Sequence, residues 1–200
     1  MKVYYSPYSP FVRKVLICAA ELGVELEKLP CAAHPIDRDR HIVEDNPLGQ
    51  VPTLFTDEGQ ALFDSTVICE YLDSTAGGSL IPRDGATRWQ RLVEQALADG
   101  ALNACLLMRY EQVIRPETLR LDTWFNAQRE KVRDALDRFE QWSATFADRV
   151  DIGTIAIACV LGYLDLRFAE EPWRERAPTL AAWYQHFGQR PSMQSTRHPV

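Results

Sequence analysis

The sequence predicts an α/β domain followed by an all-helical domain. Strand-like and helix-like segments alternate over the first part of the chain, whereas the remainder has helical periodicity almost throughout. Between them, the run Thr75-Ala76-Gly77-Gly78-Ser79 breaks the periodicity, as interdomain linkers typically do. We therefore expect one domain over residues 1–76, a linker over 77–84 and a helical domain over 85–200.

The first domain is predicted to have the order βαβ, an irregular segment, and then ββα. Residues 31–46 are polar and irregular, with room for at most one short helix. Thr56-Asp57-Glu58-Gly59 joins two apolar runs, which is a hairpin signal. The expected strands are Lys2–Tyr5, Glu25–Leu29, Pro52–Phe55 and Gln60–Phe63, and the expected helices are Phe11–Leu22, which Gly23 ends, and one that opens at Asp64-Ser65.

Long helices are predicted for the second domain. Pro116 interrupts the helical pattern between Asp84–Val113 and Glu117–Ala147. Residues 155–161 (IAIACVL) are apolar on every side, so their helix should lie in the centre of the core. Pro178 begins a last helix.

Composition and charge exclude several classes of protein. With 46% hydrophobic and 25% charged residues, the chain of 200 residues has an ordinary globular composition. A net charge of −6 argues against nucleic acid or an anionic membrane as partner. We find no apolar run long enough for a membrane span and no secretory signal in residues 1–20, so a cytoplasmic location is expected.

The five cysteines predict neither a metal site nor a redox motif. They are widely spaced, and no CxxC pair occurs. We expect all of them to be reduced and structural, and we expect no metal, because the four histidines also lack metal-ligand spacing. The cysteines are Cys18, Cys31, Cys69, Cys105 and Cys159.

Ser9 is the first candidate for chemistry. A serine directly before Pro10, at the head of an amphipathic run, is typical of a helix N-cap. A helix start also presents free N–H groups and a partial positive charge, which would favour a thiolate over its thiol. The residues alone leave a plain cap and a reactive centre both open, and Tyr5 and Ser6 remain rivals for the hydroxyl.

A second candidate is the segment NPLGQVPTL, residues 46–54. Proline is not tolerated within a central strand, so Pro52 should stand at the first residue of its strand, with a candidate cis bond to Val51. The Val51 backbone would then be able to pair with an extended peptide. A plain β-turn without a ligand explains the same residues.

Asp64 and Ser65 are the third candidate, again in a cap pattern. The helix start with Ser65 suits a carboxylate, and Asp64 suits an ammonium group. An α-amino acid carries both charges. Taken together, the three segments describe a site for a zwitterionic peptide whose thiol points at Ser9.

The chain resembles the cytosolic glutathione transferases, in particular bacterial members with a serine at the active-site turn. The resemblance covers essentially the whole chain, and the matching segments occur in the family's order. They are SPYSPFVRKV, NPLGQVPTL, FDSTVICEYL, GTIAIACVLGYLDLRF and RPSMQSTRHP.

The resemblance implies a thioredoxin-like first domain, a homodimer, and glutathione as co-substrate in detoxification. It implies that Ser9 is catalytic and hydrogen-bonds the glutathione sulfur, that Val51 before a cis-Pro52 pairs with the cysteinyl part, and that Asp64 and Ser65 bind the γ-glutamyl group. Gln50 stands where lysine is frequent, so His41 or Arg38 is an alternative contact for the glycyl end. The implied glutathione-binding set is Ser9, Phe11, His41, Gln50, Val51, Pro52, Asp64 and Ser65.

Two departures from the family pattern carry consequences. In many relatives the central helix opens with serine or threonine, followed three residues later by aspartate, whereas here the order is Asp151-Ile152-Gly153-Thr154. Asp151 can still accept a hydrogen bond from the Thr154 N–H, and the Thr154 hydroxyl can complete the reciprocal cap. Some relatives carry cysteine at the position of Ser9, and a serine cannot form a mixed disulfide.

The sequence thus predicts a glutathione transferase that attacks an electrophilic, hydrophobic co-substrate. A co-substrate cleft between the domains would be lined by Leu106, Arg109 and Tyr110. The alternatives are a glutathione-dependent disulfide reductase or peroxidase on the same fold, and a non-catalytic module that binds glutathione or another ligand.

Overall fold

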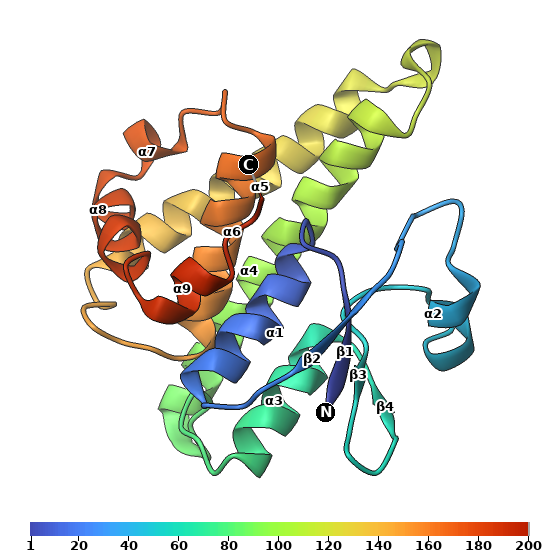
Figure 1. The fold of residues 1–200 in the computed structure, drawn as a ribbon. Coiled ribbons are helices and arrows are strands. Elements are labelled where there is room, and N and C mark those ends of the chain that lie inside the picture. The colour runs from blue at the N-terminus through green and yellow to red at the C-terminus, as the bar shows by residue number, and fades with distance from the viewer. Residues whose placement is uncertain (200) are drawn as a thin grey trace. The chain divides into compact units, whose positions relative to one another are not determined.

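The computed structural model describes residues 1–199, which are divided between two compact units (Figure 1). One unit contains Met1–Arg88 together with the chain from Pro191 onward, and the other contains Trp89–Arg190. The sequence assigned all of residues 85–200 to the helical domain. The structure differs because α9 (Pro191–Ser195) packs against α1 (Pro10–Glu21), in the first unit.

The first unit contains a mixed sheet with the strand order β2-β1-β3-β4. β1 pairs in parallel with β2 and antiparallel with β3, and β3 pairs antiparallel with β4. The predicted strands are therefore present, with the third and fourth shorter than expected. Their bounds are β1 Lys2–Tyr5, β2 Glu27–Pro30, β3 Leu54–Phe55 and β4 Ala61–Leu62.

Helices cover both sides of this sheet. α1 and α3 (Ser65–Thr75) pack together on one side, and the short α2 (Arg40–Asp45) lies on the other (Figure 1). Val3 of β1, Leu54 of β3 and Ile68 of α3 are fully buried between these layers. The apolar faces that the sequence predicted are thus the core of a thioredoxin-like α/β unit, as expected.

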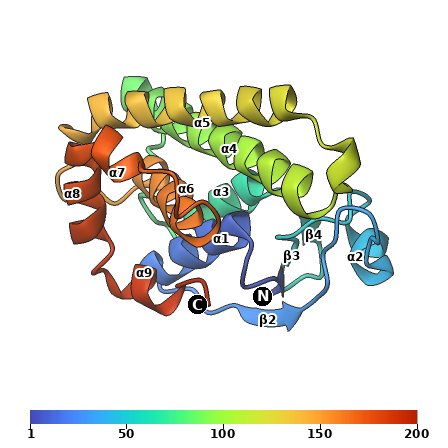
Figure 2. The same cartoon turned by 90° about the horizontal axis from the view of Figure 1, so that it is seen from above.

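The second unit is all-helical. Its helices are α4 (Gly85–Val113), the 3-10 turn η1 (Glu117–Leu119), α5 (Asp122–Ser143), α6 (Ile152–Arg167), α7 (Trp173–Arg176) and α8 (Pro178–Phe187). Figure 2 shows α7 and α8 gathered near one end of α5, against which both pack. Every residue of α6 from Ile152 to Leu164 is buried, which confirms the prediction of a central helix.

The helix predicted over Glu117–Ala147 is wrong in its extent. It is split into η1 and α5, and α5 ends at Ser143. A carboxylate distant in sequence decides where α5 begins, because Glu111 of α4 accepts a hydrogen bond from the Leu121 N–H at 2.8 Å. The Glu111 carboxylate also binds Arg115 at 2.8 Å, and these two contacts lower its pKa. Periodicity carries no signal for such a contact.

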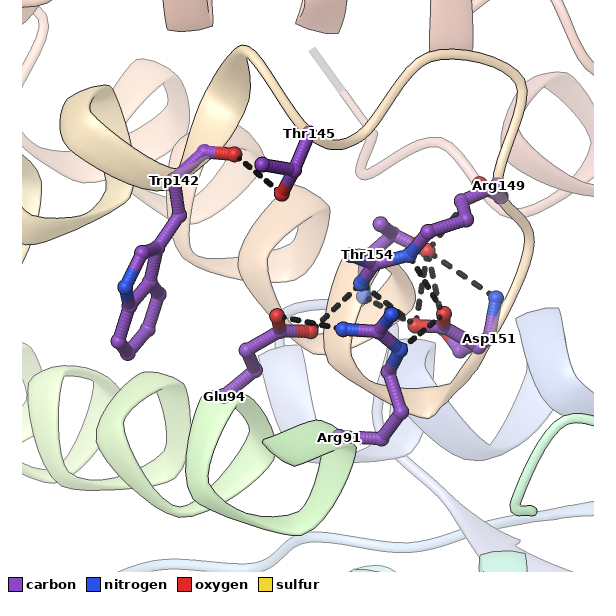
Figure 3. A network of polar contacts seen from close by, with 7 residues as sticks. All are labelled: Arg91, Glu94, Trp142, Thr145, Arg149, Asp151 and Thr154. Atoms are coloured by element: carbon purple, nitrogen blue, oxygen red, sulfur yellow. Dashed lines mark hydrogen bonds and ion pairs between the residues drawn. The ribbon is translucent and has the colours of Figure 1, made fainter. Parts of the chain in front are cut away.

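A network of ion pairs between two arginines and two carboxylates surrounds the N-terminus of α6 (Figure 3). Arg91 contacts Glu94 at 2.8 Å and Asp151 at 3.0 Å, while Arg149 contacts Glu94 at 2.6 Å and Asp151 at 2.8 Å. Thr154 completes the predicted reciprocal cap: its N–H donates to the Asp151 carboxylate at 3.0 Å, and its hydroxyl accepts from the Asp151 N–H at 3.1 Å. The reversed order of aspartate and threonine therefore preserves the capping box.

Within residues 1–199, none of the helices combines the length and the apolar character that crossing a membrane requires.

Candidate functional site

Ser9 is the N-cap of α1, as its sequence context predicted. Its backbone is extended, with φ −82° and ψ 120°, and its hydroxyl oxygen accepts a hydrogen bond from the Val12 N–H at 3.2 Å. Pro10 occupies the first helical turn. A cap of this kind uses a lone pair of the hydroxyl oxygen and leaves the hydroxyl hydrogen for another acceptor. The α1 N-terminus adds a partial positive charge beside the half-buried Ser9.

The turn that leads into Ser9 is tight. The Ser9 N–H donates to the Ser6 carbonyl at 3.2 Å, across Pro7 and Tyr8. Ser6 therefore takes part through its backbone, as a turn residue. The neighbouring Tyr4 hydroxyl is engaged elsewhere: it donates to Asp45 at 2.8 Å, and burial together with this contact raises the pKa of Tyr4 to about 12.

The Val51–Pro52 peptide bond is cis, as the position of this proline predicted. The loop before it is braced by Asn46, which is 1% exposed. The Asn46 side-chain amide donates to the Gln50 carbonyl at 3.2 Å and to the Thr53 hydroxyl at 3.0 Å. Asn46 was missed as a site residue, although an asparagine before Pro47 is a known turn signal.

Asp64 is the N-cap of α3 and accepts a hydrogen bond from the Thr66 N–H at 2.9 Å. Asp64 is exposed, whereas Ser65 is 2% exposed. The carboxylate of Asp64 is thus open to solvent, while the Ser65 side chain is largely covered. The peptide bond between Phe63 and Asp64 is also cis, which the sequence did not predict.

Sheet topology brings the three segments to one edge. β1 runs into the Ser9 turn and β4 runs into the Asp64 cap, and both strands are antiparallel to β3. The start of β3, with Val51-Pro52 before it, therefore lies at the same edge as the ends of β1 and β4. The Tyr4 N–H donates to the Thr53 carbonyl at 2.9 Å and ties the cis-proline segment to β1.

The other predicted binding residues are spread around this edge. Phe11 is half-buried on α1, and Gln50 is exposed beside Val51. His41 and Arg38 are both exposed, and the His41 N–H donates to Asp39 at 3.0 Å in the cap of α2. Nothing in these positions chooses among Gln50, His41 and Arg38.

The predicted co-substrate residues belong to the other unit. Leu106, Arg109 and Tyr110 are all half-buried on α4, and burial raises the pKa of the Tyr110 hydroxyl. Their role stays a prediction.

The C-terminal tail is the part of this region that sequence reasoning did not connect with Ser9. His198 Nδ1 lies 2.8 Å from the Pro7 carbonyl, inside the turn that leads to Ser9. The buried Arg13 of α1 donates to the Met193 carbonyl at 3.4 Å. A small cavity of about 30 Å³ is lined by residues of both segments, among them Tyr5, Ser6, Pro7, Ser9, Ser195, Thr196 and Arg197. The one indication in the sequence that this segment belongs to the site was that RPSMQSTRHP resembles the carboxyl-terminal segment of the glutathione transferases.

Cysteine chemistry is not prominent here. Cys31, at the end of β2, donates weakly to the Tyr5 carbonyl at 3.5 Å, and burial raises the pKa of its thiol, which disfavours the thiolate. Among residues 1–199, His, Cys, Asp and Glu side chains form no group of three or more that would hold a metal ion.

Two sequence profiles match the chain. The profile for "Glutathione S-transferase, N-terminal domain" matches residues 8–75, and that for "Glutathione S-transferase, C-terminal domain" matches residues 122–186. Fold and profiles define the same class, an α/β thioredoxin-like unit joined to a helical unit. The chain belongs to the glutathione S-transferase family.

Similar proteins cover the chain from end to end. The "uncharacterized GST-like protein YibF" of Escherichia coli (strain K12) is 35% identical over 203 residues, covering 100% of this chain and 99% of YibF. A glutathione transferase family member from Pseudomonas fluorescens Pf-5, solved with bound glutathione, is 44% identical, with a TM-score of 0.97 and coverage of 100% and 99% of the two chains. A glutathione S-transferase from Methylobacillus flagellatus KT, solved with glutathione bound, is 33% identical, with a TM-score of 0.90 and the same coverage.

Proposed function

We propose that this protein is a serine-type glutathione transferase. In this proposal it binds glutathione at the edge of the sheet and activates the thiol through Ser9 for attack on an electrophilic, hydrophobic co-substrate. The observation that carries the proposal is the geometry of Ser9, which caps an α-helix with its hydroxyl oxygen while its hydroxyl hydrogen remains available. The related proteins solved with glutathione support the choice of ligand.

Two features of the α1 start would favour the thiolate form of glutathione. The Ser9 hydroxyl would donate to the sulfur, and the helix N-terminus would stabilise its negative charge. A pKa lowered by about two units corresponds to roughly 2.7 kcal/mol of preference for the thiolate. The thiol proton leaves to solvent, the sulfur forms a bond to the electrophilic carbon, and the leaving group departs with the electron pair of its former bond.

The rest of the tripeptide would be held by backbone and charge. Hydrogen bonding between β1 and the chain leading into β3 begins at the Thr53 carbonyl, so the Val51 backbone before it would pair with the cysteinyl part of glutathione. The exposed Asp64 carboxylate would bind the γ-glutamyl ammonium group, and the α3 N-terminus with Ser65 would bind the carboxylate of the same group. Gln50, His41 and Arg38 are the candidates for the glycyl carboxylate.

The co-substrate residues form part of the same proposal. Leu106, Arg109 and Tyr110 would contact the co-substrate, and their mixed apolar and polar character suits an electrophile with an aromatic ring. We also expect a homodimer, as the family resemblance implies, which a sedimentation measurement would test.

A steady-state assay of Ser9→Ala beside wild type tests the proposal. With glutathione and chlorodinitrobenzene we expect kcat to fall by about 10- to 100-fold, the effect of one hydrogen bond to a charged sulfur. Ser9→Thr should retain much of the activity, because it keeps the hydroxyl. Ser6→Ala is the matched control in the same turn and should leave kcat unchanged, because Ser6 acts through its carbonyl.

Three outcomes would separate the alternatives. Equal rates for Ser9→Ala and wild type would contradict the role of Ser9. Turnover of a small disulfide or a peroxide without turnover of the aromatic electrophile would favour the reductase or peroxidase alternative. A rise in Tm on adding millimolar glutathione, without turnover of any of them, would favour a non-catalytic binding module.

A further inference from the structure

The small cavity between the Ser9 turn, β2 and the segment that follows α9 lies wholly within the first unit. Its volume of about 30 Å³ is enough for about two water molecules or for one small anion. We call it the tail cavity; it is lined by Tyr5, Ser6, Pro7, Ser9, Val12, Arg13, Leu16, Lys28, Ser195, Thr196 and Arg197.

Arg13 of α1, which lines the tail cavity, is a buried cation whose charge no carboxylate balances. It is 6% exposed, and none of the carboxylates of residues 1–199 forms an ion pair with it. Its one side-chain contact within these residues is with the neutral Met193 carbonyl, 3.4 Å from Nη2. Arginine is almost never buried without a partner for its charge, because the guanidinium has given up its water. The buried charge of Arg13 therefore favours an anion beside it.

The donor of Arg13 that an occupant of the cavity would meet is Nη1. Nε is enclosed by protein atoms and out of reach of a ligand, and Nη2 contacts the Met193 carbonyl. Nη1 is neither enclosed in this way nor hydrogen-bonded within residues 1–199. Since Arg13 lines the cavity, an anion inside it would accept a charge-assisted hydrogen bond from Nη1.

The polar side chains of the remaining lining are cations and hydroxyls. Lys28 of β2 and Arg197 add two positive charges, and the Lys28 ammonium group lies 5.2 Å from the centre of the Tyr5 ring. Both cations are exposed, so water and salt screen them more than Arg13. No aspartate or glutamate belongs to the lining. The hydroxyl donors are those of Ser6, Ser9, Ser195 and Thr196.

The carboxylates closest to these cations along the chain have other partners. Glu27 precedes Lys28 but points to the opposite face of β2, and it pairs with Lys2 at 3.3 Å. Glu21 stands at the end of α1 and accepts a hydrogen bond from the Ser192 hydroxyl. An excess of positive charge therefore remains around the tail cavity.

We propose that the tail cavity binds one small inorganic monoanion, such as chloride. The anion accepts hydrogen bonds from Arg13 Nη1 and from hydroxyls of the lining, and Lys28 and Arg197 attract it at longer range. A cation would be repelled by the three basic side chains, and a neutral molecule would leave the buried charge of Arg13 unbalanced. An organic acid of the size of gluconate exceeds the volume of the cavity.

Chloride NMR measures this binding directly, because the signal of free chloride broadens when the ion exchanges with a protein site. Titration of the full-length protein with sodium chloride, without glutathione, should give an excess line width that saturates. Two charge-assisted hydrogen bonds, each worth about tenfold in affinity, correspond to a dissociation constant on the order of 10 mM. Bromide should displace chloride and remove the excess width, whereas gluconate at equal ionic strength should not.

Variants test the charge argument. Arg13→Gln should weaken chloride binding by about tenfold, the loss of one charge-assisted hydrogen bond. The double variant Lys28→Gln/Arg197→Gln changes exposed side chains only, so it stays informative if Arg13→Gln does not fold; it should weaken binding by about three- to tenfold. Arg83→Gln is the matched control, because Arg83 is an exposed arginine of the same unit outside the cavity, and it should bind chloride as wild type does.

The proposal is overturned if wild type shows no saturable excess line width at up to about 200 mM chloride. It is equally overturned if gluconate displaces chloride as well as bromide does, or if the double variant and Arg83→Gln have the same affinity. None of these measurements uses glutathione or depends on the role of Ser9 in activating it, so their failure would leave the proposed transferase activity untouched.

Discussion

Replacing Gly153 by alanine tests how closely α4 and α6 approach in the helical unit. Gly153 is the second residue of α6, directly beside the buried Glu94 of α4. An added Cβ would stand 2.2 Å from Glu94 Oε2 and 2.9 Å from Glu94 Cβ. Glu94 has little freedom to withdraw, because Arg91 and Arg149 hold its two carboxylate oxygens at 2.8 Å and 2.6 Å (Figure 3).

The magnitude follows from two opposed effects. Displacing Glu94 leaves the guanidinium groups of Arg91 and Arg149 without one of their partners, and breaking a buried ion pair costs about 3–5 kcal/mol. Alanine gains about 1 kcal/mol over glycine in helix propensity. The free energy of unfolding should therefore fall by about 2–4 kcal/mol in Gly153→Ala.

Urea unfolding followed by circular dichroism measures this effect. Gly100→Ala is the matched control, because Gly100 lies exposed on α4 and a Cβ there meets nothing within 4 Å. This control should be as stable as wild type or more stable by up to about 1 kcal/mol. If Gly153→Ala proved as stable as Gly100→Ala, the close approach of Glu94 would not be the reason for a glycine at this position.

Two further predictions concern the helical unit. Thr154→Val should lower the free energy of unfolding by about 1–3 kcal/mol, because the buried Asp151 N–H loses its acceptor, whereas Thr154→Ser should lose less; equal urea midpoints for the two variants would refute the capping role. At alkaline pH the protein should lose stability, because burial raises the pKa of the Tyr163 hydroxyl and of the Cys105 thiol to about 12 each, from ordinary values of 10.0 and 9.0. Since the folded state then holds these protons more tightly than the unfolded state, their stabilisation is complete below about pH 9 and is lost as the pH rises toward 12. Urea unfolding should give a lower free energy of unfolding at about pH 11 than at about pH 8, and the difference should be smaller in Cys105→Ala. An equal difference in wild type and Cys105→Ala would contradict the contribution of the Cys105 thiol.

Much of the candidate site was predictable because its determinants are local. The cap at Ser9 and the cap at Asp64 each depend on contacts within three residues along the chain. The cis bond before Pro52 was expected from a proline that follows a turn, although β3 begins two residues later, at Leu54, and not at Pro52 as predicted. The capping box of Asp151 and Thr154 is of the same kind. Such contacts form wherever the segment folds, so their residue types are visible in the sequence.

Predictions failed where a distant residue decides the local structure. The helix expected to begin at Glu117 begins only at Asp122, where Glu111, ten residues before Leu121, accepts a hydrogen bond from the Leu121 N–H. The carboxyl-terminal segment was assigned to the helical domain, yet α9 packs on α1 and His198 reaches the Pro7 carbonyl. Helical periodicity reports which face of a helix is buried, and it does not report which helix covers that face.

The sequence by itself determined the order of the elements, the apolar faces of the two units and the three segments at the edge of the sheet. Those features depend on side-chain type and on spacing along one segment. The tertiary structure alone decided the packing of α9 on α1, the approach of His198 to the Pro7 carbonyl, and the need for a residue without a side chain at Gly153. Each of these depends on atoms from segments far apart in the chain, whose distances follow only from how the helices pack.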